Sequence, residues 1–315
     1  MRIAVYLPLL LSLLAPLGAR PLAERCEPRL ATWLLTATSM VLAMASTLSL
    51  AMLAATGLLR IPLLAALGHW SAQAAQRDDP AELSVALIAG LLLAAAAFAA
   101  GRMLWRRVRS LAAAVLEAAC MPAPDGLVVV DDTAPEAFAL PGLPGRVIVS
   151  TGMLHALEKS EHEVLLAHER AHLAGHHYAF VALAQFGAAA NPLLRPLASA
   201  VTFTVERWAD ESAATATGDR HKAARTVGKA ALAAHRAPAR SRIPAAALGM
   251  LGALTRRTHL SSAGPVPRRV AALLAPPLRL RPAPALATAA ILAVAVWSTA
   301  EAAHDLHLLL EHAGA

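Results

Sequence analysis

Charged, aromatic and cysteine residues are all scarce in this sequence of 315 residues. Asp, Glu, Lys and Arg make up 16% of the chain, whereas an average soluble domain carries about 25%. Hydrophobic residues make up 57% and the mean hydropathy is +0.53, which excludes an ordinary soluble enzyme and favours a membrane protein. The two cysteines, Cys26 and Cys120, lie far apart and form no CxxC pair, so no disulfide framework is indicated.

The shortage of aromatic residues also limits what the net charge of +7 can mean. A basic chain can bind nucleic acid, but such a surface usually interleaves basic and aromatic side chains. Here the arginines stand beside apolar runs instead. We therefore expect contact with membrane lipid and no direct contact with nucleic acid.

Long apolar runs are abundant, and four are long enough to cross a hydrocarbon core about 30 Å thick, which takes about 20 residues. They cover approximately residues 3–19, 31–59, 83–101 and 283–300. The predicted organisation has three transmembrane helices in residues 1–101, a more polar region at 102–282, a fourth transmembrane helix at 283–300 and a short external tail at 301–315. The predicted fold class is mainly α, a polytopic membrane protein carrying an α+β domain.

Arginines cluster after the first and third spans and before the fourth. They are Arg20, Arg25, Arg29, Arg102, Arg106, Arg107, Arg109, Arg268, Arg269, Arg279 and Arg281. The positive-inside rule then puts residues 102–282 in the cytoplasm, in a multi-pass protein of the cell membrane with both termini outside. Alternatively, residues 1–19 are a cleaved signal peptide. That alternative would move residues 102–282 to the outside, against the arginine bias.

In residues 102–282, the expected cytoplasmic region, the sequence predicts both strands and helices. Strands are expected at residues 127–132, 136–140 and 146–150, and helices at 110–119, 193–217 and 221–235. A further helix is expected to begin at Ser160, because Ser160 and Glu163 have the spacing of a capping box. The apolar stretch Tyr178–Ala190 is too short to cross a membrane. We expect it to turn back within the interface or to pack on the neighbouring spans.

One polar stretch interrupts this apolar chain. Residues 160–178 hold five of the thirteen histidines and three glutamates. Within them His168, Glu169 and His172 form H-E-x-x-H, whose spacing puts both imidazoles on one helical face, where they can bind zinc. Glu169 then lies near the zinc and can act as a general base. The alternative is a polar helix face with no metal.

A catalytic zinc needs a third protein ligand. The H-E-x-x-H-x-x-G-x-x-H pattern would need a histidine where the chain has Tyr178, and His176 misses that register, which makes it a neighbour, a weak ligand or an exposed histidine. The better candidate is Glu206, since a carboxylate on a largely apolar helix is costly unless paired or metal-bound. Asp210 follows one turn later and can orient a ligand histidine. Otherwise Glu206 belongs to a solvated helix face.

H-E-x-x-H followed by E-x-x-A-D resembles the gluzincin-type membrane peptidases. These include the CAAX prenyl protease and heat-shock membrane protease group, and the antirepressor peptidases of β-lactam-sensing transducers. The similarity runs from about Leu127 to Asp210. It implies a zincin-like domain with one Zn²⁺ per chain, the ligands His168, His172 and Glu206, and Glu169 as the base. Only 15 residues follow Ala300, so we expect no penicillin-binding sensor domain.

The expected function is a membrane-bound zinc metalloendopeptidase that cleaves a protein or peptide substrate at the cytoplasmic face. By analogy with the antirepressor branch, the substrate would be a cytoplasmic transcriptional repressor, bound along the strand at residues 136–140. The alternatives are a general membrane-protein quality-control protease and a non-catalytic zinc-binding signalling scaffold, in which His176 would complete a closed site. Candidates for a second oxyanion donor are Tyr178, His259 and Arg269.

Overall fold

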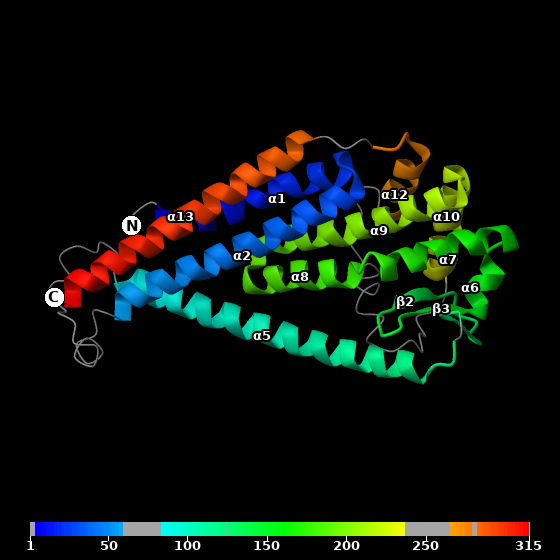
Figure 1. The fold of residues 1–315 in the computed structure, drawn as a ribbon, viewed down its shortest axis with the longest axis horizontal. Coiled ribbons are helices and arrows are strands. Elements are labelled where there is room, and N and C mark those ends of the chain that lie inside the picture. Colours follow the sequence, from blue (N-terminus) through cyan, green and yellow to red (C-terminus); the bar gives the residue numbers. More distant parts are fainter. Residues whose placement is uncertain (1–3, 59–82, 124, 237–264, 279–281, 315) are drawn as a thin grey trace.

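The computed structural model describes residues 4–58, 83–123, 125–236, 265–278 and 282–314. These residues are mostly helical and form an elongated molecule with one small sheet at one end (Figure 1). Helix α1 begins and helix α13 ends at the opposite end of the molecule (Figure 1). The loop between residues 60 and 82, Arg279, Arg281 and His259 lie outside the described residues.

Among the described residues, four helices are long and apolar enough to cross a membrane, as the prediction of about four spans requires. They are α1 (Leu7–Arg25, preceded by the 3-10 turn Ala4–Tyr6), α2 (Pro28–Leu58), α5 (Leu83–Cys120) and α13 (Pro282–Gly314). The separate helices predicted at 83–101 and 110–119 are one continuous helix, because most of the residues between them are Arg, Met or Leu, which are good helix formers. Helix α13 likewise continues through most of the predicted tail.

The sheet has three strands, all close to their predicted positions. They are β1 (Leu127–Val130), β2 (Ala137–Leu140) and β3 (Arg146–Ser150). Strand β3 is central, parallel to β1 and antiparallel to β2, so β2 is an edge strand. Phe138 and Leu140 of β2 are buried against Ala114 and Ala118 of α5, which anchors the sheet to the end of that long helix.

The remaining helices follow the sheet in the sequence. They are α6 (Thr151–Ala156), α7 (Lys159–Ala174), α8 (His177–Ala190), the 3-10 turn Pro192–Leu194, α9 (Arg195–Thr217), α10 (Arg220–Arg236) and α12 (Pro265–Leu274). The predicted capping box at Ser160 and Glu163 is wrong by two residues. Glu158 and Glu161 form it instead, because Lys229 of α10 lies 2.8 Å from a carboxylate oxygen of each and holds that pair in place.

Helix α8 packs against α2, α5 and α9, as expected for a segment too short to span a membrane. At Gly187 a Cβ atom would lie only 2.6 Å from Ser39 Oγ, so the absence of a side chain permits the close contact with α2. Asn191 Nδ2 donates to Ser46 Oγ at 3.0 Å, where α8 ends. These contacts join residues of the polar region directly to a predicted span.

The last turn of α1, just before the chain turns into α2, contacts α9 and α12. Arg207 Nη1 donates to the carbonyl oxygen of Ala23 at 2.6 Å. Arg268 of α12 forms an ion pair with Glu24 at 3.0 Å. The first loop of the chain and the region 102–282 therefore lie at the same end of the helical bundle.

Candidate active site

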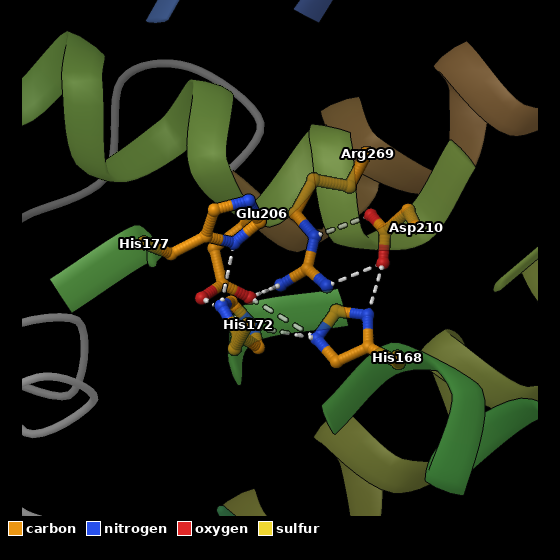
Figure 2. Close-up of polar contacts among 6 residues, drawn as sticks. All are labelled: His168, His172, His177, Glu206, Asp210 and Arg269. Carbon is orange, nitrogen blue, oxygen red and sulfur yellow. Dashed lines mark hydrogen bonds and ion pairs between the residues drawn. The ribbon is translucent and has the colours of Figure 1, made fainter. Parts of the chain in front are cut away.

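Helices α7 and α9 pack side by side and bring together three side chains that could hold a metal ion (Figure 2). His168 and His172 lie one turn apart on α7, and Glu206 lies on α9. One donor atom from each lies within 4.8 Å of the others. We call these three residues the His-His-Glu cluster. Glu206 and His172 are buried, with 5% and 8% of their surface exposed, so the carboxylate and the imidazole have little contact with solvent.

The spacing of the donors fits a zinc ion. The Nε2 atoms of His168 and His172 lie 3.2 Å apart. Two nitrogens bound tetrahedrally at about 2.0–2.1 Å from zinc would lie about 3.3 Å apart. The Glu206 oxygens lie 3.7 Å from His168 Nε2 and 3.6 Å from His172 Nε2, too long for hydrogen bonds but suited to a shared ion. Two imidazoles and a carboxylate are also a donor set that zinc prefers.

Glu169 is the next residue on α7 and is 5% exposed. Burial raises the pKa of its carboxyl group to about 7, against the opposing influence of nearby His168 and Arg269. The backbone of Ala139 in β2 interacts with this carboxyl group. Its Oε2 atom is buried and has no hydrogen-bond partner among the described residues. The side chain can therefore exchange a proton near neutral pH and has an oxygen available for a further partner.

The guanidinium of Arg269, from α12, lies between the carboxylates of Glu206 and Asp210 (Figure 2). Arg269 donates to both carboxylate oxygens of Asp210 at 2.7 Å and lies 2.8 Å from Glu206 Oε2. Asp210 Oδ1 lies 3.1 Å from His168 Nδ1. Arg269 thus fixes two carboxylates and leaves another oxygen of Glu206 for a metal.

His177 is a site residue that the sequence analysis missed. It is fully buried at the start of α8, and its Nδ1 lies 2.9 Å from Nδ1 of His172. If His172 binds a metal through Nε2, its Nδ1 carries the proton and donates a hydrogen bond to His177 Nδ1. His176 precedes it in the left-handed conformation, with φ of 50°, and this turn directs His177 back towards α7. The only signal in the sequence is a further histidine five residues after His172.

The two histidines of the cluster have opposite pKa shifts. Burial lowers the pKa of His172 to about 4. Burial acts in the same direction on His168, but Asp210 and Glu206 outweigh it and raise the pKa to about 10. Without a metal, His168 therefore carries the positive charge that balances the carboxylates around it.

Most of the residues singled out from the sequence lie together in this region. His168, Glu169, His172, Glu206 and Asp210 come together from α7 and α9. His176 is exposed and lies outside the cluster. Arg269 does reach the site, but its guanidinium engages two carboxylates. Tyr178 packs near the His176 ring, with 6.4 Å between centroids, and His259 lies outside the described residues.

Comparison with known proteins identifies the family. The model of peptidase family M48 matches residues 102–276, more than half of the chain. The matched segment begins within α5, ends after α12 and includes the whole cluster. Neither the curated proteins nor the solved structures contain a match to the chain. Members of the matching family are zinc-dependent metallopeptidases. The chain therefore belongs to peptidase family M48, and its four apolar helices indicate that it is a multi-pass membrane protein.

Proposed function

We propose that this protein is a membrane-embedded zinc metalloendopeptidase that cleaves protein substrates at the cytoplasmic face. The observation that carries the proposal is the convergence of His168, His172 and Glu206 donor atoms within 4.8 Å, with buried Glu169 beside them. Membership of a metallopeptidase family supports it. The cytoplasmic orientation rests on the arginines that follow the third span and precede the fourth.

The His-His-Glu cluster would hold the zinc ion. When bound, zinc supplies Lewis-acid chemistry, which lowers the pKa of a water molecule to about 7 and polarises a peptide carbonyl. Structural zinc sites usually have four protein ligands, whereas catalytic sites have three. The described part of the chain offers three donors here, and His176 is exposed and outside the group. This supports catalysis over the scaffold alternative.

Glu169 would act as the general acid and base. Its carboxyl group has a pKa of about 7, so it can accept a proton from the attacking water near neutral pH. It can then return that proton to the nitrogen of the leaving amine. Its unpartnered, buried Oε2 has no competing hydrogen bond among the described residues.

Three further residues would position the ligands. Arg269 holds Glu206 and Asp210, and Asp210 in turn contacts His168. His177 would accept a hydrogen bond from the Nδ1–H of His172, which leaves His172 Nε2 free to bind metal. Since both carboxylates occupy the Arg269 guanidinium, we propose a positioning role for it rather than the oxyanion role considered from the sequence.

Strand β2 would bind the substrate. Glu136 accepts a hydrogen bond from the backbone of Ser150, so backbone groups of alternate residues from Glu136 onward point at β3. The backbone groups of Ala137 and Ala139 point to the outer edge of the sheet, and the backbone of Ala139 interacts with the Glu169 carboxyl group. An extended peptide paired with this edge would pass directly beside Glu169. This geometry favours an unfolded or extended segment as substrate.

The identity of the substrate can be tested directly. By resemblance to the antirepressor branch, we propose a cytoplasmic transcriptional repressor. New protein N-termini would be compared in cells that carry the wild type or the Glu169→Gln variant. A repressor fragment that depends on Glu169 would support this proposal. If the only Glu169-dependent fragments come from membrane proteins, the quality-control alternative replaces it.

The metalloendopeptidase proposal itself is tested on the purified full chain in detergent. We expect about one zinc per chain, and cleavage of an unfolded test protein that stops when a chelator is added. The double variant His168→Ala/His172→Ala is expected to lose zinc and activity together. Glu169→Gln is expected to keep zinc and to lose at least about a hundredfold in kcat.

The same variants also give the results that would contradict the metalloendopeptidase proposal. Full zinc occupancy in the double histidine variant would show that the cluster is not the metal site. Unchanged processing by a zinc-loaded Glu169→Gln variant would favour the non-catalytic scaffold. Arg170→Gln, on the exposed side of the same helix, is the control for effects on α7 itself.

A further inference from the structure

A cavity of about 670 Å³ lies between the middle of α5, the end of α8 and the start of α9. This volume falls within the range of ligand-binding pockets, about 300–1,000 Å³. None of the residues of the His-His-Glu cluster lines it. The cavity is therefore distinct from the proposed catalytic site.

Four arginines line this cavity. They are Arg102, Arg106, Arg107 and Arg195, and no Asp or Glu is among its described lining residues. Within the described part of the chain, none of the four forms an ion pair with a carboxylate, and Arg107 donates instead to the neutral amide oxygen of Gln185. Four like charges around one space repel each other, and an anion bound there would relieve this repulsion.

The start of α9 adds to the positive potential. This helix runs for 23 residues from Arg195, and no side chain caps its first N–H groups. Ala198 and Ser199 of its first turns line the cavity. The amino end of a helix carries a partial positive charge that favours anions. Together with the arginines, it gives the cavity a positive potential that favours an anion.

The position of the cavity relative to the membrane interface indicates which class of anion fits it. The apolar run of α5 ends at Gly101, and Arg102 and Arg106 follow directly. Trp105, on the same stretch, is 63% exposed, as expected for a residue at a membrane interface. Most of the remaining wall is apolar, formed by Met103, Pro192 and alanines of α5, α8 and α9, whereas Gln185, Ser199 and Thr202 add uncharged polar groups. Arginines at the headgroup level beside an apolar wall match the two chemical halves of a phospholipid.

We infer that this cavity binds an anionic phospholipid, with its phosphate group against the arginines and the start of α9. The acyl chains lie along the apolar wall and leave towards the bilayer. Such a lipid would hold α5 to the α8–α9 hairpin, where Arg107 and Gln185 supply the described polar contact between them. Binding here is independent of the proposed peptidase activity.

The test uses native mass spectrometry of the full chain in detergent. Phosphatidylglycerol and phosphatidylcholine with the same acyl chains are titrated, and the dissociation constant of the first bound lipid is measured. We expect phosphatidylglycerol to bind at least about tenfold more tightly. Arg106→Gln and Arg195→Gln are each expected to weaken its binding about fivefold. Arg109→Gln is the matched control, since Arg109 lies one turn from Arg106 on α5 but outside the cavity, and we expect less than about a twofold change.

Several results would overturn the inference. Equal affinity for both lipids would exclude a site for anionic headgroups. An equal loss in Arg109→Gln would show that charge near the membrane acts without the cavity. If inorganic phosphate at about 10 mM displaced phosphatidylglycerol in the wild type but not in Arg106→Gln, the cavity would be a soluble-phosphate site instead. Circular dichroism identifies a misfolded variant, and Arg102→Gln then takes its place.

Discussion

His168 and His172 lie one helical turn apart on α7, yet their surroundings give them different properties. His168 faces Asp210 and Glu206, whereas His172 faces the neutral ring of His177. The pKa of His177 is lowered to about 3, mainly by burial, so at neutral pH this ring is uncharged and can accept a hydrogen bond from the Nδ1–H of His172. The two proposed ligands are therefore held by different partners, one by a carboxylate and one by a histidine.

The raised pKa of His168 predicts that zinc binding releases a proton. In the metal-free protein its pKa is about 10, so the ring is charged at neutral pH, whereas a metal ligand must be neutral. Between pH 6.5 and 8 we expect release of about one proton per zinc, and an affinity that rises up to about tenfold per pH unit. Calorimetry in two buffers of different ionisation enthalpy measures the release. A zinc-binding enthalpy that does not depend on the buffer would contradict this.

The contact between His177 and His172 predicts a loss of zinc affinity in His177→Ala. Removal of a group that orients a ligand typically weakens metal binding about 10–100-fold. We expect that range here, measured by competition with a chromophoric chelator. His177→Asp offers a carboxylate to the same His172 Nδ1–H and should recover part of the affinity. The control is His176→Asn, since Asn tolerates the left-handed conformation of that exposed position. An equal effect of both changes would point to general disruption of α8.

At the scale of elements, the site depends on how closely α8 and α9 approach α2. Thr32 of α2 donates to Thr204 of α9 at 2.9 Å, and Ser39 donates to the carbonyl oxygen of Ala184 at 3.3 Å. Leu35 and Leu42 are buried in the same apolar cluster as Phe180 and Val201. Helix α2 is therefore both a predicted span and the support for the helix that carries Glu206.

This close packing predicts that Gly187→Ala destabilises the protein. Its Cβ would lie 2.6 Å from Ser39 Oγ and 2.9 Å from the Ser39 carbonyl oxygen, so α8 would have to move away from α2. Overpacking of this kind costs about 1–3 kcal/mol, which we expect as a lower melting temperature in detergent. Gly228→Ala on α10 is the control, because nothing lies within 4 Å of its added Cβ. Helix propensity predicts a gain of up to about 1 kcal/mol there, so a loss in both variants would contradict the packing argument.

At the scale of the whole molecule, the proposed catalytic end of the bundle also holds the α1–α2 turn. Arg268 bridges this turn to α12, the helix that carries Arg269. The positive-inside rule predicts that this end lies in the cytoplasm. The two cysteines allow a test, because Cys120 at the end of α5 is exposed and Cys26 is buried.

We predict that Cys120 is inaccessible from outside the cell. A membrane-impermeant maleimide should label it only in inverted vesicles or after the cells are permeabilised. Cys120→Ser should abolish the labelling and thus identify the residue. Labelling of Cys120 in intact cells would instead put the site outside, as the signal-peptide alternative for residues 1–19 requires.

The sequence alone determined the features that depend on local periodicity. The four apolar helices follow from run length, since only a chain segment of that length and composition spans a bilayer. The pairing of His168 and His172 follows from their i, i+4 spacing, which any α-helix converts into a shared face. Glu206 and Asp210 were found because carboxylates on an apolar helix need a partner.

Only the tertiary structure decided which distant groups complete the site. The closeness of Arg269 to Glu206 and of Ala139 to Glu169 depends on how α12, α9, α7 and β2 pack, and no local pattern records such distances. His177 reaches His172 only because the chain turns at His176, a conformation that its sequence does not single out. The predicted start of α7 was wrong for the same reason. The pairs Ser160/Glu163 and Glu158/Glu161 have the same spacing, and Lys229, far along the chain, contacts the second pair.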